Sequence, residues 1–134
     1  MEPENWNKLV QYRLDSAKER LDSAKVLLER GLYKDSIGRS YYAMFTAVRA
    51  LLITEGRDFS KHSGVISYFQ KEYVKTGKFE KRYSKYISAA FQIRNNTDYA
   101  DFFIVSQSDA KEQLERAQEF YHAIETYIKK IAER

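Results

Sequence analysis

Apolar residues recur along most of the chain at alternating intervals of four and three positions, a spacing that places them on one face of an α-helix. The sequence shows no run of alternating apolar and polar residues, the pattern of a half-buried strand. Five helices are predicted, four long and one short, over residues 5–30, 34–55, 63–74, 79–99 and from 106 nearly to the C-terminus. Long helices joined by short connections pack as antiparallel neighbours, so we expect an all-α, up-down helical bundle.

Each predicted helix carries an apolar stripe that we expect to form the core. The second helix is apolar over the widest arc and should therefore be the central one, with Ile37, Tyr41, Tyr42, Met44, Phe45, Val48, Leu51 and Leu52. The stripes of the first and third helices are Val10, Leu14, Ala17, Leu21, Ala24 and Leu28, and Val65, Ile66, Phe69 and Tyr73. Those of the fourth and fifth are Phe79, Tyr83, Tyr86, Ala90, Ile93 and Thr97, and Ala110, Leu114, Ala117, Tyr121, Ile124, Ile128 and Ile131.

Several helix ends carry recognisable stop or start residues. Gly31 and Gly56 stand where helix C-caps are expected, because glycine accepts the left-handed backbone conformation found there. Ser106 and Asp109 have the spacing of a capping box, in which each side chain accepts a hydrogen bond from the backbone N–H of the other. We therefore expect the fifth helix to begin at Ser106.

Composition favours one ordinary globular domain over residues 1–134. A chain of this length removes roughly two thirds of its unfolded surface from water on folding, and no linker-like segment divides it. Cysteine is absent, which excludes disulfides and thiolate metal sites. The acidic start, Met1–Glu4, does not suit a signal peptide, and no apolar run approaches the ~18 residues of a membrane span. We expect a cytoplasmic protein without membrane contact.

Positive charge is concentrated in the middle of the sequence. The net charge is +4, and residues 57–94 contain nine Lys or Arg against three Asp or Glu. Tyrosines alternate with these cations, an arrangement that can stack bases and grip phosphates. The alternative is that the tyrosines belong to the core and the cations only keep the bundle soluble. The candidate RNA-binding cations of this segment are Lys78, Lys81, Arg82 and Lys85.

Motifs for metal or nucleophilic chemistry are weak. Glu119 and His122 form a Glu-x-x-His pair, but a di-metal bundle site needs a second pair and two more carboxylates, so we predict no metal and no cofactor. The closest approach to a phosphate-binding loop is the segment from Lys61 to Gly64, where backbone N–H groups at a helix start could hold an anion. We favour the simpler interpretation that Ser60 or Ser63 caps this helix.

Three blocks of sequence, residues 40–52 (SYYAMFTAVRALL), 61–66 (KHSGVI) and 94–102 (RNNTDYADF), resemble the HEPN superfamily (higher eukaryote and prokaryote nucleotide-binding), especially its small, stand-alone, largely uncharacterised prokaryotic branch. The resemblance implies a helical bundle that forms homodimers. It also implies a frequent partner, a minimal nucleotidyltransferase, with which such proteins form toxin–antitoxin pairs.

Catalytic members of that superfamily are metal-independent ribonucleases with an Arg-x4-6-His motif at the dimer interface. Arg94 matches the arginine, but the three permitted histidine positions hold Tyr99, Ala100 and Asp101. Imidazole suits the proton transfers of RNA cleavage near neutral pH, whereas a tyrosine with a pKa of about 10 is a poor base. The pair Asp98–Tyr99 resembles a feature of this branch. Arg94 and Asp98 are also four residues apart, so a structural ion pair is the alternative.

We therefore expect a homodimeric binding or accessory module, with enzymatic activity doubtful because the motif lacks its histidine. The candidate residues for binding nucleotide or RNA, besides the basic segment above, are Lys61, His62, Arg94, Asp98 and Tyr99. Two alternatives remain open. One is a ribonuclease whose site uses Arg94, Tyr99 and His62, and the other is a purely structural dimer.

Overall fold

The computed structural model describes residues 3–99 and 101–133, and throughout these ranges the regular structure is helical. Its helices are α1 (Pro3–Glu29), α2 (Tyr33–Ile53), α3 (His62–Phe69), α4 (Lys81–Tyr99) and α5 (Gln107–Ala132), and a short π-helix, η1 (Gln70–Val74), continues α3. The prediction of an all-α bundle with four long helices and one short helix is confirmed. Within the described ranges, no helix is both long and apolar enough to cross a membrane.

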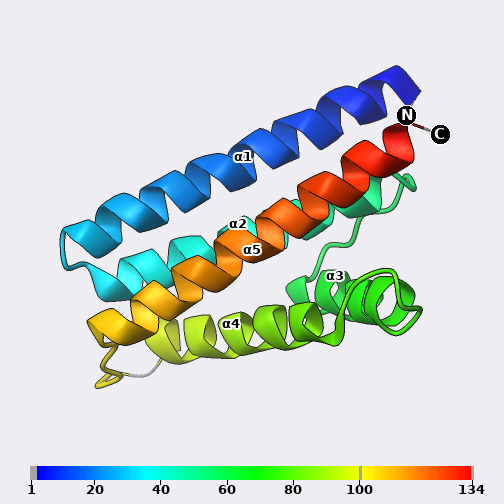
Figure 1. The fold of residues 1–134 in the computed structure, drawn as a ribbon. Coiled ribbons are helices and arrows are strands. Elements are labelled where there is room, and N and C mark those ends of the chain that lie inside the picture. Colours follow the sequence, from blue (N-terminus) through cyan, green and yellow to red (C-terminus); the bar gives the residue numbers. More distant parts are fainter. Residues whose placement is uncertain (1–2, 100, 134) are drawn as a thin grey trace.

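Each long helix runs antiparallel to the next long helix along the chain, so that α2 and α5 point the same way, and α2 lies at the centre (Figure 1). α2 packs against α1, α3, α4 and α5, whereas α1 packs only against α2 and α5 among the described elements. The start of α1 and the end of α5 lie at one end of the bundle, and the α1–α2 turn and the α4–α5 loop lie at the other. The expectation that the widest apolar arc marks the central helix is confirmed.

The core follows the predicted stripes, with one offset in each of α4 and α5. Most of the α1 stripe is buried, as are the α2 residues from Tyr41 to Leu52 that were predicted to face the core, apart from the partly buried Tyr42. In α4 and α5, Ile87 and Phe120 are fully buried, whereas the predicted Tyr86 and Tyr121 are only partly buried. The tyrosines lie at the edge because their hydroxyl groups donate hydrogen bonds to carboxylates, at 3.2 Å for Tyr86 and 3.1 Å for Tyr121.

The predicted caps of α1, α2 and α5 are present. Gly31 and Gly56 have φ angles of 79° and 71°, in the left-handed region. Beyond Gly31 the N–H of Leu32 donates to the carbonyl of Leu27 at 2.9 Å, which closes the end of α1 as a Schellman motif. Ser106 and Asp109 form both hydrogen bonds of the capping box.

The third helix differs from the prediction in two respects. Its first half is α3, but its second half widens into the π-helix η1, where Gln70 donates a side-chain hydrogen bond to Ser88 of α4 at 2.7 Å. The prediction that Ser60 or Ser63 caps this helix is wrong: Lys61 precedes its first residue, and no side chain bonds to the free N–H groups there.

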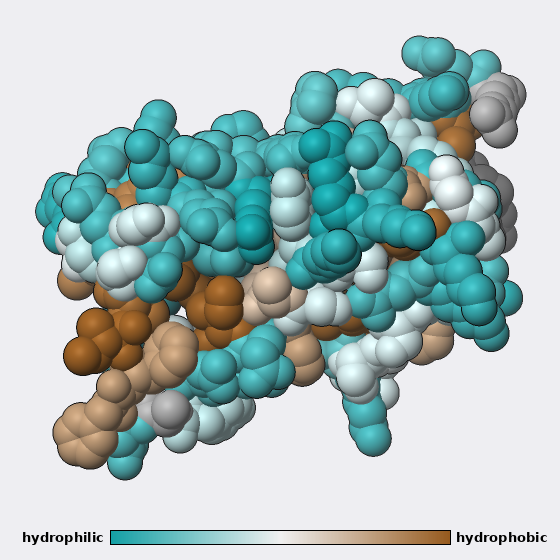
Figure 2. Space-filling model, turned by 60° about the horizontal axis from the view of Figure 1, so that its bottom comes forward, coloured by the Kyte–Doolittle hydropathy of each residue, from teal (hydrophilic) through white to brown (hydrophobic). Residues whose placement is uncertain are grey.

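Apolar side chains are exposed at the end of the bundle formed by the α1–α2 turn and the α4–α5 loop. Leu32, Tyr99, Phe102 and Ile104 are exposed by 49%, 78%, 95% and 87%. Figure 2 shows brown and tan side chains gathered at this end, while most of the remaining visible surface is hydrophilic. We call this part of the molecule the apolar end and define it by these four residues.

Candidate functional site: the Arg94–His62 cluster

Arg94 is held on α4 by contacts within its own helix and across to α2. Its Nε lies 2.9 Å from Oδ2 of Asp98, off the N–H direction, so this contact is an ion pair more than a hydrogen bond. Its Nη2 donates to the hydroxyl of Tyr42 at 2.8 Å, and its guanidinium carbon lies 5.2 Å from the centre of the Tyr42 ring. The Arg94–Asp98 ion pair anticipated from the four-residue spacing therefore forms.

His62, at the start of α3, packs against the same part of α2. Its ring stacks on Phe45 with centroids 4.0 Å apart, and Nδ1 lies 2.7 Å from the Tyr41 hydroxyl. Burial lowers the pKa of His62, and the positive charges of Arg94 and Arg49 lower it further. Both effects favour the uncharged imidazole.

Tyr41 and Tyr42 bring His62 and Arg94 into one cluster. The Tyr41 ring centre lies 5.9 Å from the Arg94 guanidinium carbon and 5.9 Å from the centre of the His62 ring. Burial raises the pKa of Tyr41, so its hydroxyl stays protonated. The sequence could not establish this approach of His62 to Arg94, because the two residues belong to different helices.

Tyr99 does not join this cluster. It follows Arg94 by five positions, which turns its side chain about 140° around the helix, and it is 78% exposed. Within one chain, the three residues of the alternative ribonuclease site are therefore not assembled. Lys61, next to His62, is exposed.

The basic candidates of the middle segment lie at the opposite end of α4. Lys81 and Arg94 are about 20 Å apart along the helix, from the rise of 1.5 Å per residue. Arg82 pairs with Glu119 of α5 at 2.7 Å, which ties the two helices together. Lys78 lies over the Tyr73 ring at 5.1 Å, and Lys85 is exposed. The predicted binding residues thus lie in two separate places, one at the cluster of Arg94 and His62 and the other around the start of α4.

The tyrosines among these cations serve mainly the core. Tyr73 and Tyr83 are buried, at 3% and 7% exposure, and Tyr68 and Tyr86 are partly buried. Buried rings offer no face on which a base could stack. For Tyr73 and Tyr83 the base-stacking interpretation is therefore wrong, because their rings pack against Phe79 instead.

A groove beside the cluster includes two cations that sequence reasoning missed. It has a volume of about 430 Å³ and lies between Tyr42 and Asp98, with Lys34, Gly38 and Arg39 along it. Lys34, Gly38 and Tyr42 follow one another at intervals of four on α2, which places them on one helix face. This spacing could have indicated a shared helix face from the sequence, but nothing in the sequence shows that Asp98 of α4 lies next to that face.

Glu119 and His122 do not form part of a metal site in the described portion of the chain. The Glu119 carboxylate is engaged by Arg82 and by the Tyr86 hydroxyl, and His122 is exposed. No group of three or more His, Asp or Glu side chains there is arranged to hold a metal ion.

Comparisons with known proteins agree with this architecture. A UPF0332 protein of Thermotoga maritima is 38% identical over 124 residues, which cover 92% of this chain and 94% of the relative. "Putative toxin MJ0605" of Methanocaldococcus jannaschii is 33% identical, covering 91% of this chain and 90% of its own. The crystal structure of TT1696 from Thermus thermophilus shares the fold with a TM-score of 0.75, at 18% identity, over 88% of this chain and 97% of that one. The family model of the HEPN domain matches residues 10–127, and the chain therefore belongs to the HEPN family.

Proposed function

We propose that this HEPN protein is a binding module without ribonuclease activity, which acts as a homodimer and as the accessory partner of a minimal nucleotidyltransferase in a toxin–antitoxin-type pair. The name of the Methanocaldococcus jannaschii relative, which includes the words "putative toxin", supports the toxin–antitoxin part. The nucleotidyltransferase and the homodimer follow from the family resemblance.

The observation that carries the proposal is the state of Arg94. Its guanidinium is already bonded to Asp98 and Tyr42, and no histidine follows it at the motif spacing. RNA cleavage needs one group that removes the proton of the 2′-hydroxyl and another that protonates the leaving oxygen. His62 is the one imidazole near Arg94 in the described chain, and its Nδ1 is occupied by Tyr41. The cluster thus offers one imidazole for a reaction that needs two proton-transferring groups, whereas its guanidinium supplies a cation with which a phosphate could pair.

We further propose that the ligand is nucleotide or RNA, bound by its phosphates in the groove between Tyr42 and Asp98. Lys34 and Arg39 line this groove and give it positive charge. Arg94 lies beside it, in contact with the Tyr42 and Asp98 side chains that also line it. The carboxylates of Asp35 and Asp98 also line it, which limits the net charge. Phosphates would be bound by the cations, and the carboxylates could accept hydrogen bonds from ribose hydroxyls.

Incubating the purified protein with single-stranded RNA in the presence of a metal chelator tests the proposal. We expect no cleavage, but binding that weakens as salt rises. Arg94→Ala should weaken binding by about tenfold, as expected for one charge-assisted hydrogen bond, and should reduce the salt slope by about 0.7. Arg20→Ala is the matched control, since Arg20 lies on α1 and donates a hydrogen bond to the Ser16 carbonyl of its own helix. Metal-free cleavage that is lost in Arg94→Ala would overturn the proposal.

A ribonuclease built on Arg94, His62 and Tyr99 is the second candidate, favoured by the approach of His62 to Arg94. It predicts that His62→Ala abolishes cleavage while circular dichroism shows unchanged helicity. A protein that neither cleaves RNA nor binds it in a salt-sensitive manner would instead support the purely structural dimer.

A further inference from the structure

A second, smaller cluster of apolar side chains lies outside the main core, where α2, α4 and the α4–α5 loop meet. It includes the buried Ile37 of α2 and Val105 of the loop, with Ile93 of α4 and Phe103 packed against them. The same four side chains line a pocket of about 270 Å³. Because they come from three separate segments of the chain, this apolar wall exists only in the folded protein.

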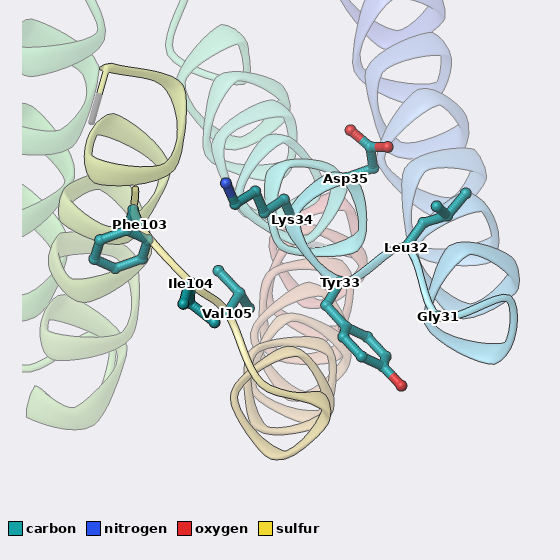
Figure 3. A pocket seen from close by; sticks show the side chains of 8 residues that line it. All are labelled: Gly31, Leu32, Tyr33, Lys34, Asp35, Phe103, Ile104 and Val105. Carbon is teal, nitrogen blue, oxygen red and sulfur yellow. The ribbon is translucent and has the colours of Figure 1, made fainter. Parts of the chain in front are cut away.

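The α4–α5 loop also borders a second, larger hollow on the side of the α1–α2 turn. In Figure 3 the residues Phe103–Val105 of the loop face the residues Gly31–Asp35 across this hollow, which has a volume of about 440 Å³. The charged side chains along it, Lys34 and Asp35, are exposed, so water already solvates them. The smaller pocket differs because one of its polar side chains is buried.

Side chains of α5 form the polar wall of the smaller pocket. Asp109, Glu112, Gln113 and Arg116 line it, and intervals of three and four residues place them on one helix face. Gln113 is only 4% exposed, and its Oε1 is buried without a hydrogen-bond partner in the described part of the chain. An amide oxygen in this state lowers stability, because folding removes it from water and provides no bond in return. A molecule in the pocket that donates a hydrogen bond to Gln113 would remove this penalty.

The charges around the smaller pocket disfavour an anion. Asp109 and Glu112 are negative, and Arg116 is the one positive residue among those that line it. The Arg116 guanidinium already pairs with Glu112 at 2.7 Å, and its carbon lies 5.0 Å from the centre of the Tyr86 ring. A phosphate or carboxylate in the pocket would therefore meet the Asp109 carboxylate, while the cation is already paired. Repulsion of this kind favours an uncharged ligand.

We propose that the smaller pocket binds a small, neutral molecule with an apolar body and an amide group. The N–H of the ligand donates to Oε1 of Gln113, and the carbonyl of the ligand accepts from Nε2, as in a pair of amides. The apolar body lies against Ile37, Ile93 and Phe103. Among the described residues, the pocket shares no lining side chain with the groove between Tyr42 and Asp98, so this site is separate from the proposed phosphate site.

NMR titration of the isotope-labelled full chain with benzamide tests the proposal. We expect saturable shifts of the backbone amide signals of Phe103, Val105 and Gln113, with a dissociation constant of about 1 mM for so small a ligand. Acetophenone has a methyl group in place of the amide nitrogen, and benzoate has a carboxylate, so both should bind at least about tenfold more weakly. Benzamide that causes no saturable shifts at these residues would overturn the proposal and leave the pocket to water. Acetophenone or benzoate that binds as tightly as benzamide would overturn it as well.

The variant Gln113→Met supplies a second readout, because it removes the amide and keeps a similar volume. We expect its affinity for benzamide to fall at least about tenfold, while its urea midpoint stays the same or rises, since the unpartnered oxygen is gone. Gln118→Met is the matched control: Gln118 is exposed on the same helix, so affinity and midpoint should both stay unchanged. Unchanged benzamide affinity in Gln113→Met would show that this amide does not recognise the ligand. A lower urea midpoint would show that the amide stabilises the fold instead, and either result refutes the proposal.

Discussion

Two neighbouring tyrosines of α2 divide the polar contacts of the site between them. Tyr41 shares a hydrogen bond with His62 on α3, and Tyr42 accepts one from Arg94 on α4. Successive residues on a helix point about 100° apart, so the pair reaches two different helices from one turn. Substituting either tyrosine would therefore disturb one partner directly and leave the bond of the other in place.

His62 should make the stability of the protein depend on pH. Its folded pKa lies below the ordinary value of about 6.5, because of burial and of the charges on Arg94 and Arg49. As pH falls below 6.5, His62 becomes protonated in the unfolded state while it remains largely unprotonated in the folded state. The stabilising contribution is therefore complete above the unfolded pKa and is lost as pH falls toward the folded one. We expect the wild type to lose more free energy of unfolding between pH 7.5 and 5.5 than His62→Gln.

Urea denaturation at the two pH values measures this difference. One proton limits the slope to about 1.4 kcal/mol per pH unit, and partial exposure of His62 makes the actual slope smaller. His122→Gln is the control for the histidine substitution itself, since His122 is exposed on α5. Equal slopes in the wild type and in His62→Gln would show that His62 titrates normally in the folded protein.

The periodicity of apolar residues predicted the helices well, but it predicted which residues are buried only to within one sequence position. Ile87 and Phe120 are buried in place of the predicted Tyr86 and Tyr121. Adjacent residues of a helix point only about 100° apart, so the apolar pattern alone does not decide between them. The decision depends on polar partners, such as Glu119 of α5 for Tyr86, that come from another helix. The widening into η1 has no comparable pattern in the sequence. The contact of His62 with Tyr41 spans 21 positions and follows only from tertiary packing.

Substitution by alanine should change the stability of the protein in opposite directions at Gly31 and Gly38. Gly31→Ala places a Cβ on a residue with a φ of 79°, although the added carbon would meet nothing nearer than 4.0 Å. The cost is therefore conformational, about 1 kcal/mol. Gly38 lies within α2, where a Cβ meets nothing within 4 Å, so alanine should stabilise the helix by about 0.5–1 kcal/mol.

Thermal and urea unfolding of the two variants give the comparison directly. Each variant serves as the control for the other, since both carry the same glycine-to-alanine change and are expected to shift stability in opposite directions. A loss of stability in Gly38→Ala would mean that the groove between Tyr42 and Asp98, which Gly38 lines, tightens around the added methyl group.

At the scale of the whole molecule, polar contacts fix the connection that carries the chain from α2 to α3. Asp58 in this connection accepts hydrogen bonds from Arg13 of α1 and Arg49 of α2, both at 2.9 Å, and from the backbone N–H of Phe59. Burial acts to raise the pKa of Asp58, but the bonds from Arg49 and Arg13 prevail and lower it to about 2. The carboxylate thus joins three parts of the chain just before α3 places His62 against Phe45.

Removing this charge should therefore loosen the link between α1, α2 and α3. The side chain of Asp58 is 39% exposed, so we expect Asp58→Asn to lower the free energy of unfolding by only about 1 kcal/mol at pH 7. Because the folded pKa lies below the ordinary value of about 3.9, the contribution is complete above that value and is lost as pH falls toward 2. The difference in free energy of unfolding between wild type and variant should shrink over the same pH range, and also in 1 M salt.

Asp22→Asn is the control, because it breaks an exposed ion pair with Lys18 on α1. It should lower the free energy of unfolding by less than about 0.5 kcal/mol. Equal losses in the two variants, measured by urea denaturation, would show that Asp58 acts as an ordinary surface charge.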